Sequence, residues 1–204
     1  MGIVNLIKGK WDGKVGQLVG SKWKDKATLR SYAIPSNPNT QGQQTTRKGF
    51  GDVSKFVALF SDQIKALSPL NTRSMTVRNA ILSLNKDMVA NGTLDAANLK
   101  ISRGGLPAVN TFAATASVGE NKITANWTAV TGSTITAKAI VVVVAVDKAA
   151  NAAYVGSALN TAGTLEIPGT FNAANNLDCY AYLLDFRGSA KVGSVSVHKQ
   201  VTPA

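Results

Sequence analysis

The chain has 204 residues, of which 45% are hydrophobic, and it carries a net charge of +11. This hydrophobic content is sufficient for a packed core and excludes a disordered protein. The single cysteine, Cys179, excludes an intramolecular disulfide, and because it lies in an apolar run we expect a buried, unreactive thiol.

The positive charge is concentrated in the first half of the chain. Residues 1–103 contain 16 Lys and Arg against 6 Asp, a net charge of +10, whereas residues 104–204 carry +1. Such a field favours nucleic acid, an acidic protein face or an anionic membrane as partner, although a solvated basic surface gives the same count. The longest apolar run, 139–146, is too short to cross a bilayer, and the chain opens without a secretory leader. We therefore predict no membrane partner, synthesis in a reducing cytoplasm and no Sec-dependent secretion.

The first 34 residues mix glycine with lysine and tryptophan. Two strand-like runs, Leu18 to Trp23 and Ala27 to Tyr32, flank Lys24-Asp25-Lys26, which is typical of a hairpin. Glycines at this density disfavour a helix and suit close backbone approach. We therefore expect a basic, glycine-rich β-hairpin arm.

Two helices are predicted next. Pro35 and Pro38 impose an extended joint. From Thr40 to Leu67 apolar residues recur at three- and four-residue spacings, which predicts an amphipathic helix with an interruption near Ser61. The second helix is predicted from Thr72 to about Val89.

Beyond residue 103 the pattern changes to short strands separated by turn signals. Val141 to Val144 fits a central strand buried on both faces, and Trp127, at the end of an alternating strand, is expected in the core. The predicted class is α+β, with a basic arm and helices over 1–103 and an antiparallel β-sandwich over 104–204. The expected strands are Thr111–Ser117, Lys122–Thr128, Thr136–Val146, Ala152–Leu159, Gly163–Ile167, Cys179–Phe186 and Val192–Lys199.

No group of residues predicts catalysis or cofactor binding. Gly9-Lys-Trp-Asp-Gly13-Lys14 is one residue short of a phosphate-binding loop, and Val15 stands where Ser or Thr must hold magnesium. His198, the only histidine, and Cys179 do not supply the three or four ligands of a zinc site. A Cys179–His198 nucleophile pair lacks an evident orienting group. We predict no enzyme, no cofactor and no metal.

The basic, aromatic arm is the remaining candidate site. Trp and Arg are typical interface anchors, whereas Lys acts through charge at a rim. The glycines would let backbones approach, as addition of a strand to a neighbouring sheet requires. Aromatic rings among lysines could equally stack on nucleic-acid bases, or the tryptophans could form a local core. The predicted interface residues are Trp11, Lys14, Gly16, Gly20, Trp23, Lys24 and Arg30.

The last hundred residues resemble a known class of domain. Trp127, Leu165-Glu-Ile-Pro168 and Tyr180-Ala-Tyr182 resemble the core tryptophan and the Leu-x-Pro to Tyr segment of fibronectin type III and immunoglobulin-like domains. The resemblance implies a scaffold for binding, because such sandwiches carry many unrelated functions.

A series of short motifs runs along most of the chain: Gly13-Lys-Val-Gly16, Val19-Gly20-Ser-x-Trp23-Lys24, Leu29-Arg30-Ser31, Asn37-Pro38-x-Thr40 and Leu99-Lys-Ile101. Their order resembles a family of small Bacteroidota and phage-associated proteins. That resemblance implies no catalytic residue, and it implies a virion component of tail, collar or capsid-accessory type, made in the bacterial cytoplasm. We therefore expect a non-enzymatic, self-assembling structural protein located in the virion, with itself and other virion proteins as partners. The alternative is a basic nucleic-acid-binding module.

Overall fold

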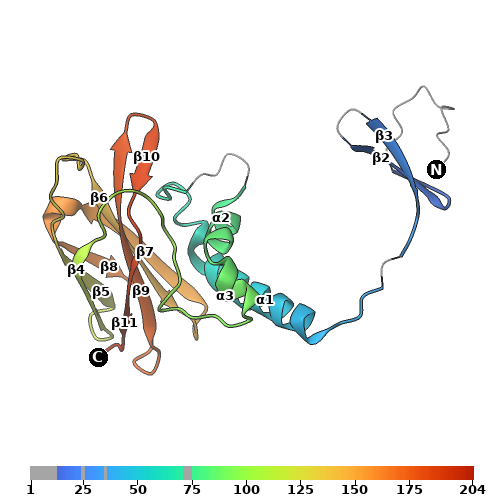
Figure 1. The fold of residues 1–204 in the computed structure, drawn as a ribbon. Helices are drawn as coiled ribbons and strands as arrows, with labels where there is room; N and C mark the ends of the chain where they lie inside the picture. The colour runs from blue at the N-terminus through green and yellow to red at the C-terminus, as the bar shows by residue number, and fades with distance from the viewer. Residues whose placement is uncertain (1–12, 24–25, 35, 71–74) are drawn as a thin grey trace. The chain divides into compact units, whose positions relative to one another are not determined.

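The computed structural model describes residues 13–23, 26–34, 36–70 and 75–204. The chain divides into two compact units, Met1–Asn39 and Thr40–Ala204, which we call the arm and the body. Helices and antiparallel sheets both occur, as the predicted α+β class requires (Figure 1).

The arm is an antiparallel sheet of order β1-β2-β3. The predicted hairpin is confirmed in β2 (Leu18–Trp23) and β3 (Lys26–Ser31). The additional strand β1 (Gly13–Val15) was not predicted. It turns into β2 at Gly16, whose φ of +58° lies in the left-handed region that glycine adopts without a steric penalty.

Helix α1 (Gln41–Ser61) begins after Thr40, whose hydroxyl accepts a hydrogen bond from the backbone N–H of Gln43 at 3.4 Å. The apolar spacing gives it one buried face, which includes Val53, Phe56 and Phe60. It ends at Ser61, where the predicted interruption lies. None of the described helices combines the length and hydropathy needed to span a membrane.

The second predicted helix is broken into α2 (Val77–Leu84) and α3 (Lys86–Ala90). The break lies at Asn85, a buried residue whose side-chain amide donates to the carbonyl oxygens of Ile81 and Lys100, both at 2.8 Å. Its Oδ1 accepts from the backbone N–H of Lys100 at 2.9 Å. The side chain of Asn85 thus ties the break between the helices to the returning chain at Lys100, while its backbone N–H still donates to the carbonyl oxygens of Ile81 and Leu82. The predicted start, Thr72, lies outside the described residues.

The strands of the body form two antiparallel sheets. One has the order β4-β5-β8, and the other has the order β10-β9-β6-β7 with β11 also paired to β9. The bounds are β4 (Asn110–Ser117), β5 (Lys122–Thr128), β6 (Ile140–Asp147), β7 (Ala152–Leu159), β8 (Thr164–Pro168), β9 (Leu177–Arg187), β10 (Ala190–Gly193) and β11 (Val197–Val201).

Two apolar cores lie on opposite faces of the larger sheet. Val141, Val143 and Ala145 of β6 point toward the smaller sheet and pack with Trp127, which is 5% exposed. Val142, Val144 and Val146, which alternate with them, pack against the helices. The predictions that β6 is buried on both faces and that Trp127 is a core residue are confirmed.

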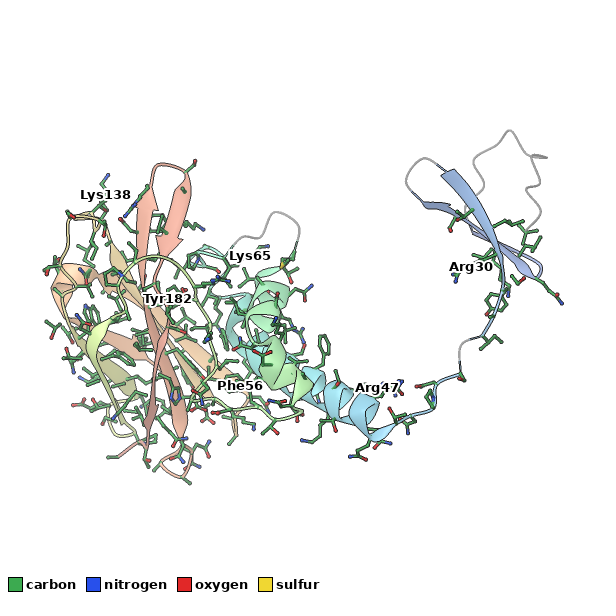
Figure 2. The ribbon with its side chains drawn as sticks, in the orientation of Figure 1. Arg30, Arg47, Phe56, Lys65, Lys138 and Tyr182 are labelled. Carbon is green, nitrogen blue, oxygen red and sulfur yellow. The ribbon has the colours of Figure 1, made fainter. Side chains whose placement is uncertain are left out.

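The helices and the larger sheet therefore belong to one unit. Figure 2 shows Phe56 of α1 and Tyr182 of β9 in the layer between them, and Phe56 also meets Tyr180 edge to face, with ring centroids 6.5 Å apart. The compact units consequently divide after Asn39 rather than at the predicted boundary between residues 103 and 104. An amphipathic helix must cover its apolar face, and here the sheet is what covers it.

Candidate functional site: the two faces of the arm

The strand register assigns the side chains of the arm to two faces. Paired residues share a face, and successive residues of a strand alternate between faces. Val15 pairs with Leu18, and Gly20 pairs with both Leu29 and Gly13. These residues therefore lie on one side of the sheet. Lys14 pairs with Val19, which pairs with Arg30, so these residues lie on the opposite side.

The first side, which we call the apolar face, is formed by Val15, Leu18, Gly20 and Leu29. Its three large side chains are exposed, with 60% of Val15, 42% of Leu18 and 54% of Leu29 accessible to solvent. An isolated apolar side chain on a surface is ordinary, but three on one face of so small a sheet form a patch typical of binding surfaces.

The second side, which we call the basic face, is formed by Lys14, Arg30 and Tyr32. The Lys14 ammonium lies 3.5 Å from the centroid of the Tyr32 ring, in cation–π geometry. At an exposed site such a contact contributes about 0.5–1 kcal/mol. Arg30, labelled in Figure 2, is exposed on the outer strand β3. This face offers positive charge and an aromatic ring to a partner.

The predicted interface residues are thereby separated by role. Lys14 and Arg30 share the basic face. Gly20 is buried and lies on the apolar face, between its paired neighbours Gly13 and Leu29. Gly16 lies in the turn, and a Cβ there would meet no atom within 4 Å. Within the chain its requirement for glycine comes from its positive φ, and close backbone approach to a second copy stays a prediction. Trp23 ends β2. Trp11 and Lys24 lie outside the described residues.

Val15, Leu18 and Leu29 were missed as site residues. Each stands at an alternate position of a short strand, so period-2 alternation was the available signal. The missing knowledge was the register, because only pairing brings Val15, Leu18 and Leu29 to one face.

In the body, the structure separates Cys179 from His198. Cys179 lies fully buried in the core between the sheets, and burial, with a smaller effect of Asp178, raises the pKa of its thiol to about 12. His198 pairs with Tyr180, the next residue along β9, so its side chain lies on the other face of the sheet. There its Nε2 is 2.9 Å from Oδ1 of Asp178. The two residues do not form a nucleophile pair.

The described residues also contain no group of three or more His, Cys, Asp or Glu side chains placed to hold a metal ion. A hollow of about 720 Å³ lies between α1 and α2 and is bordered by Phe50 and Met75. Arg78 lines this hollow, and two N–H groups of its guanidinium donate to the hydroxyl oxygen of Ser54, at 2.6 and 3.1 Å.

Of the comparisons with known proteins, one gives a match, to a protein family. No curated protein and no solved structure matches the chain. The family described as a family of unknown function, DUF6266, matches residues 9–196. This range includes the described arm and nearly all of the body, so the chain belongs to the DUF6266 family.

Proposed function

We propose that this protein is a non-enzymatic structural subunit that assembles with copies of itself through the arm. The observation that carries the proposal is the apolar face, where Val15, Leu18 and Leu29 are all more than 40% exposed. Burying such side chains against a partner contributes about 25 cal/mol per Å² of apolar surface removed from water. An exposed apolar patch on a small separate unit is therefore best explained by a partner that covers it.

The wider assembly would be a virion part of tail, collar or capsid-accessory type, with other virion proteins as further partners. This step depends on the resemblance of the motifs to phage-associated proteins. A subunit of such a particle needs self-complementary surfaces rather than a reaction centre.

We also propose that the two sheets of the body are a fibronectin type III-like sandwich. Support comes from the strand order, since an early three-stranded sheet faces a larger sheet, and from the buried Trp127 on β5. The match at Tyr180 and Tyr182 does not carry over, because both rings point toward the helices and their hydroxyls donate to the carbonyl oxygens of Ala96 and Leu67.

The second candidate function is nucleic-acid binding through the basic face. The arm, residues 1–39, contains 7 Lys and Arg against 2 Asp, a net charge of +5. Lys14 and Arg30 would contact phosphates, and the Tyr32 ring would offer a stacking surface. Affinity arising in this way must fall steeply as salt rises, because binding releases counterions.

A pair of double variants separates the two functions. Leu18→Ser with Leu29→Ser removes the apolar face, whereas Lys14→Gln with Arg30→Gln removes charge from the basic face. Self-assembly is measured by sedimentation and negative-stain imaging, and binding to a duplex is measured by gel shift at low and moderate salt. We expect the first variant to lose assembly and the second to retain it.

Deletion of residues 1–39 completes the test. Because the body contains both cores, the shortened chain should stay folded, with its helical and strand signals in circular dichroism preserved, but should fail to assemble. A full-length chain that stays monomeric at high concentration would overturn the proposal. Loss of duplex binding in the Lys14→Gln, Arg30→Gln variant alone would favour the second function.

A further inference from the structure

The edges of the two sheets in the body differ in how they are protected. An edge strand presents unpaired backbone N–H and C=O groups, which can pair with another chain unless a bulge, a charge, a proline or a covering segment prevents it. In the described body the edges are β4 and β8 in one sheet, and β7 and the β10/β11 side in the other.

The β10/β11 side is covered by residues 101–106. The backbone N–H of Leu106 donates to the carbonyl oxygen of Gly193 at 3.1 Å, and that of Ile101 donates to the hydroxyl of Ser196 at 3.1 Å. The Ser102 hydroxyl donates to the carbonyl oxygen of Ser194 at 2.7 Å. A strap of the chain's own backbone therefore occupies this edge.

The edges of the smaller sheet are also protected. Strand β4 exchanges hydrogen bonds with Ala204, whose N–H donates to Ala116 at 3.0 Å and whose carbonyl accepts from Val118 at 2.9 Å. Its register is further broken near Thr111, which has a φ of +49°. Strand β8 is five residues long, ends at Pro168 and carries Glu166.

Among the described residues, strand β7 has no charge, proline, bulge or bonded backbone segment on its edge, and a single side chain, Gln63, covers one of its outward carbonyls. It contains eight residues, Ala-Ala-Tyr-Val-Gly-Ser-Ala-Leu, without a charge or a proline, and it pairs with β6 through all eight without a break. The Gln63 side-chain amide donates to the carbonyl oxygen of Ala153 at 3.2 Å, so the backbone of Ala153 points away from β6. By alternation Val155 and Ser157 also direct their backbone groups outward, and no described backbone group bonds to them.

The outer strand of the arm has the matching property. The backbone N–H of Tyr32 donates to the carbonyl oxygen of Gln17 at 2.7 Å, toward β2. The alternate residues Leu29 and Ser31 of β3 therefore direct their backbone groups away from β2, at the end of the sheet order. Both strands thus have an unpaired edge among the described residues.

The end of helix α1 places a negative group beside this edge, although the body as a whole carries a net charge of +6, from 15 Lys and Arg against 9 Asp and Glu in residues 40–204. Helix α1 ends beside β7, as the Gln63 contact shows, with Asp62 as its C-cap and no basic residue in its last turn. The carboxylate and the negative end of the helix dipole attract cations. The arm brings a net charge of +5, with Arg30 exposed on β3.

We infer that β7 is the acceptor edge on which strand β3 from the arm of a second copy is added. The inference rests on the proposed function, since it names the surface that the assembling arm would bind. Backbone hydrogen bonds would hold the added strand, as in other cases of strand addition, and the small side chains Gly156, Ser157 and Ala158 allow its approach.

The first test compares Ser157→Pro with Ser157→Thr in the full-length chain. Proline removes the outward N–H and is tolerated in an edge strand, whereas threonine keeps the N–H. We expect the concentration needed for half-assembly, measured by sedimentation, to rise at least tenfold for Ser157→Pro and to stay within twofold for Ser157→Thr. A folded Ser157→Pro protein that assembles normally overturns the inference.

The second test does not depend on the proline variant folding. A chain with Ser31→Cys, an exposed residue of β3 outside the three large apolar side chains, is mixed with a chain with Ser157→Cys, and a short bismaleimide linker is added. The native Cys179 is fully buried and leaves the new thiols to react. We expect a cross-linked dimer from this mixture and none when Thr164→Cys, an exposed residue on the β8 edge, replaces Ser157→Cys.

The remaining outcomes are also decisive. Equal cross-linking to Thr164→Cys overturns the inference, as does cross-linking found only within one chain when both Ser31→Cys and Ser157→Cys are present. If deletion of residues 1–39 abolishes assembly while folded Ser157→Pro assembles, the proposed function stands and the acceptor edge is wrong. If Ser157→Pro fails to assemble while the deletion still assembles, β7 binds something other than the arm.

Discussion

The arm and the body differ in where their apolar side chains lie. Among the described residues, every apolar side chain that is buried belongs to the body, between Val53 and Val201. The arm instead exposes Val15, Leu18 and Leu29 on one face of a small sheet. The comparison teaches that the body can account for its own stability, whereas the arm has apolar surface to offer a partner.

Thiol labelling should give the largest contrast between the two units. Cys179 is fully buried in the body, and burial raises its pKa to about 12, so at pH 8 its thiol is both covered and protonated. A cysteine placed at Val15, which is 60% exposed, has neither protection. In Val15→Cys we expect Cys179 to react with a thiol reagent at least about a thousandfold more slowly than the new cysteine, because reaction requires opening of the body.

Truncation of Trp127 should give the next largest effect. Trp127 packs in the core between the sheets, and its indole N–H donates to the carbonyl oxygen of Asn160 at 2.9 Å. We expect Trp127→Ala to lower the free energy of unfolding by about 3–5 kcal/mol in urea titrations. The measurement needs residues 40–204 or the whole chain, because the helices share a core with the sheet.

Leu18→Ala in the arm is the matched control for Trp127→Ala. Because 42% of Leu18 is exposed, the same measurement should change by no more than about 0.5 kcal/mol. A similar loss in both variants would contradict the division between arm and body.

Two glycines of α1 should respond with opposite signs. A Cβ on Gly49 would overlap the carbonyl oxygen of Val89 and lie 2.7 Å from Cα of Gly92, so Gly49→Ala should destabilise the body by about 1–3 kcal/mol. A Cβ on Gly51 would meet no atom within 4 Å, so Gly51→Ala should stabilise it by about 0.5–1 kcal/mol. Thermal unfolding of the two variants decides, and an unchanged stability of Gly49→Ala would mean that α1 does not approach Val89 and Gly92 this closely.

The smallest expected effect is local to the arm. Gly16 has a φ of +58°, which costs a residue with a Cβ about 1–2 kcal/mol. Gly16→Ala should therefore loosen the β1–β2 turn, seen as faster amide exchange at Lys14 and Val19, while Gly16→Asn, which tolerates this φ, should change it less. The melting temperature of the body should not move in either variant, and a shift would show that the units are coupled.

The sequence predicted the local elements well because their signals are local. Strands Lys122–Thr128 and Ala152–Leu159 were predicted with the bounds that the structure has. The double burial of β6 followed from its unbroken valines, and the position of Trp127 followed from alternation.

What the sequence did not reveal depends on contacts between distant residues. The break at Asn85 requires Lys100 as partner, and the shared core of helices and sheet requires α1 to meet β6 and β9. Tyr180 and Tyr182 fit the tyrosine motif of fibronectin type III domains in sequence, but their rings lie on the side of β9 that packs against the helices. In the arm, the apolar face could be identified only once the pairing of the strands was known, because that pairing brings Val15, Leu18 and Leu29 to one side.

The double burial of β6 and β9 has a consequence for how the chain emerges from the ribosome. Helix α1 is complete at Ser61, but the valines and tyrosines that cover its apolar face lie about 80 to 120 residues later. At about 5–20 residues per second, the wait for β9 is roughly 6 to 24 s. During that time Val53, Phe56 and Phe60 lack their final partners, so the helical layer is a natural client for a chaperone until the C-terminal strands arrive.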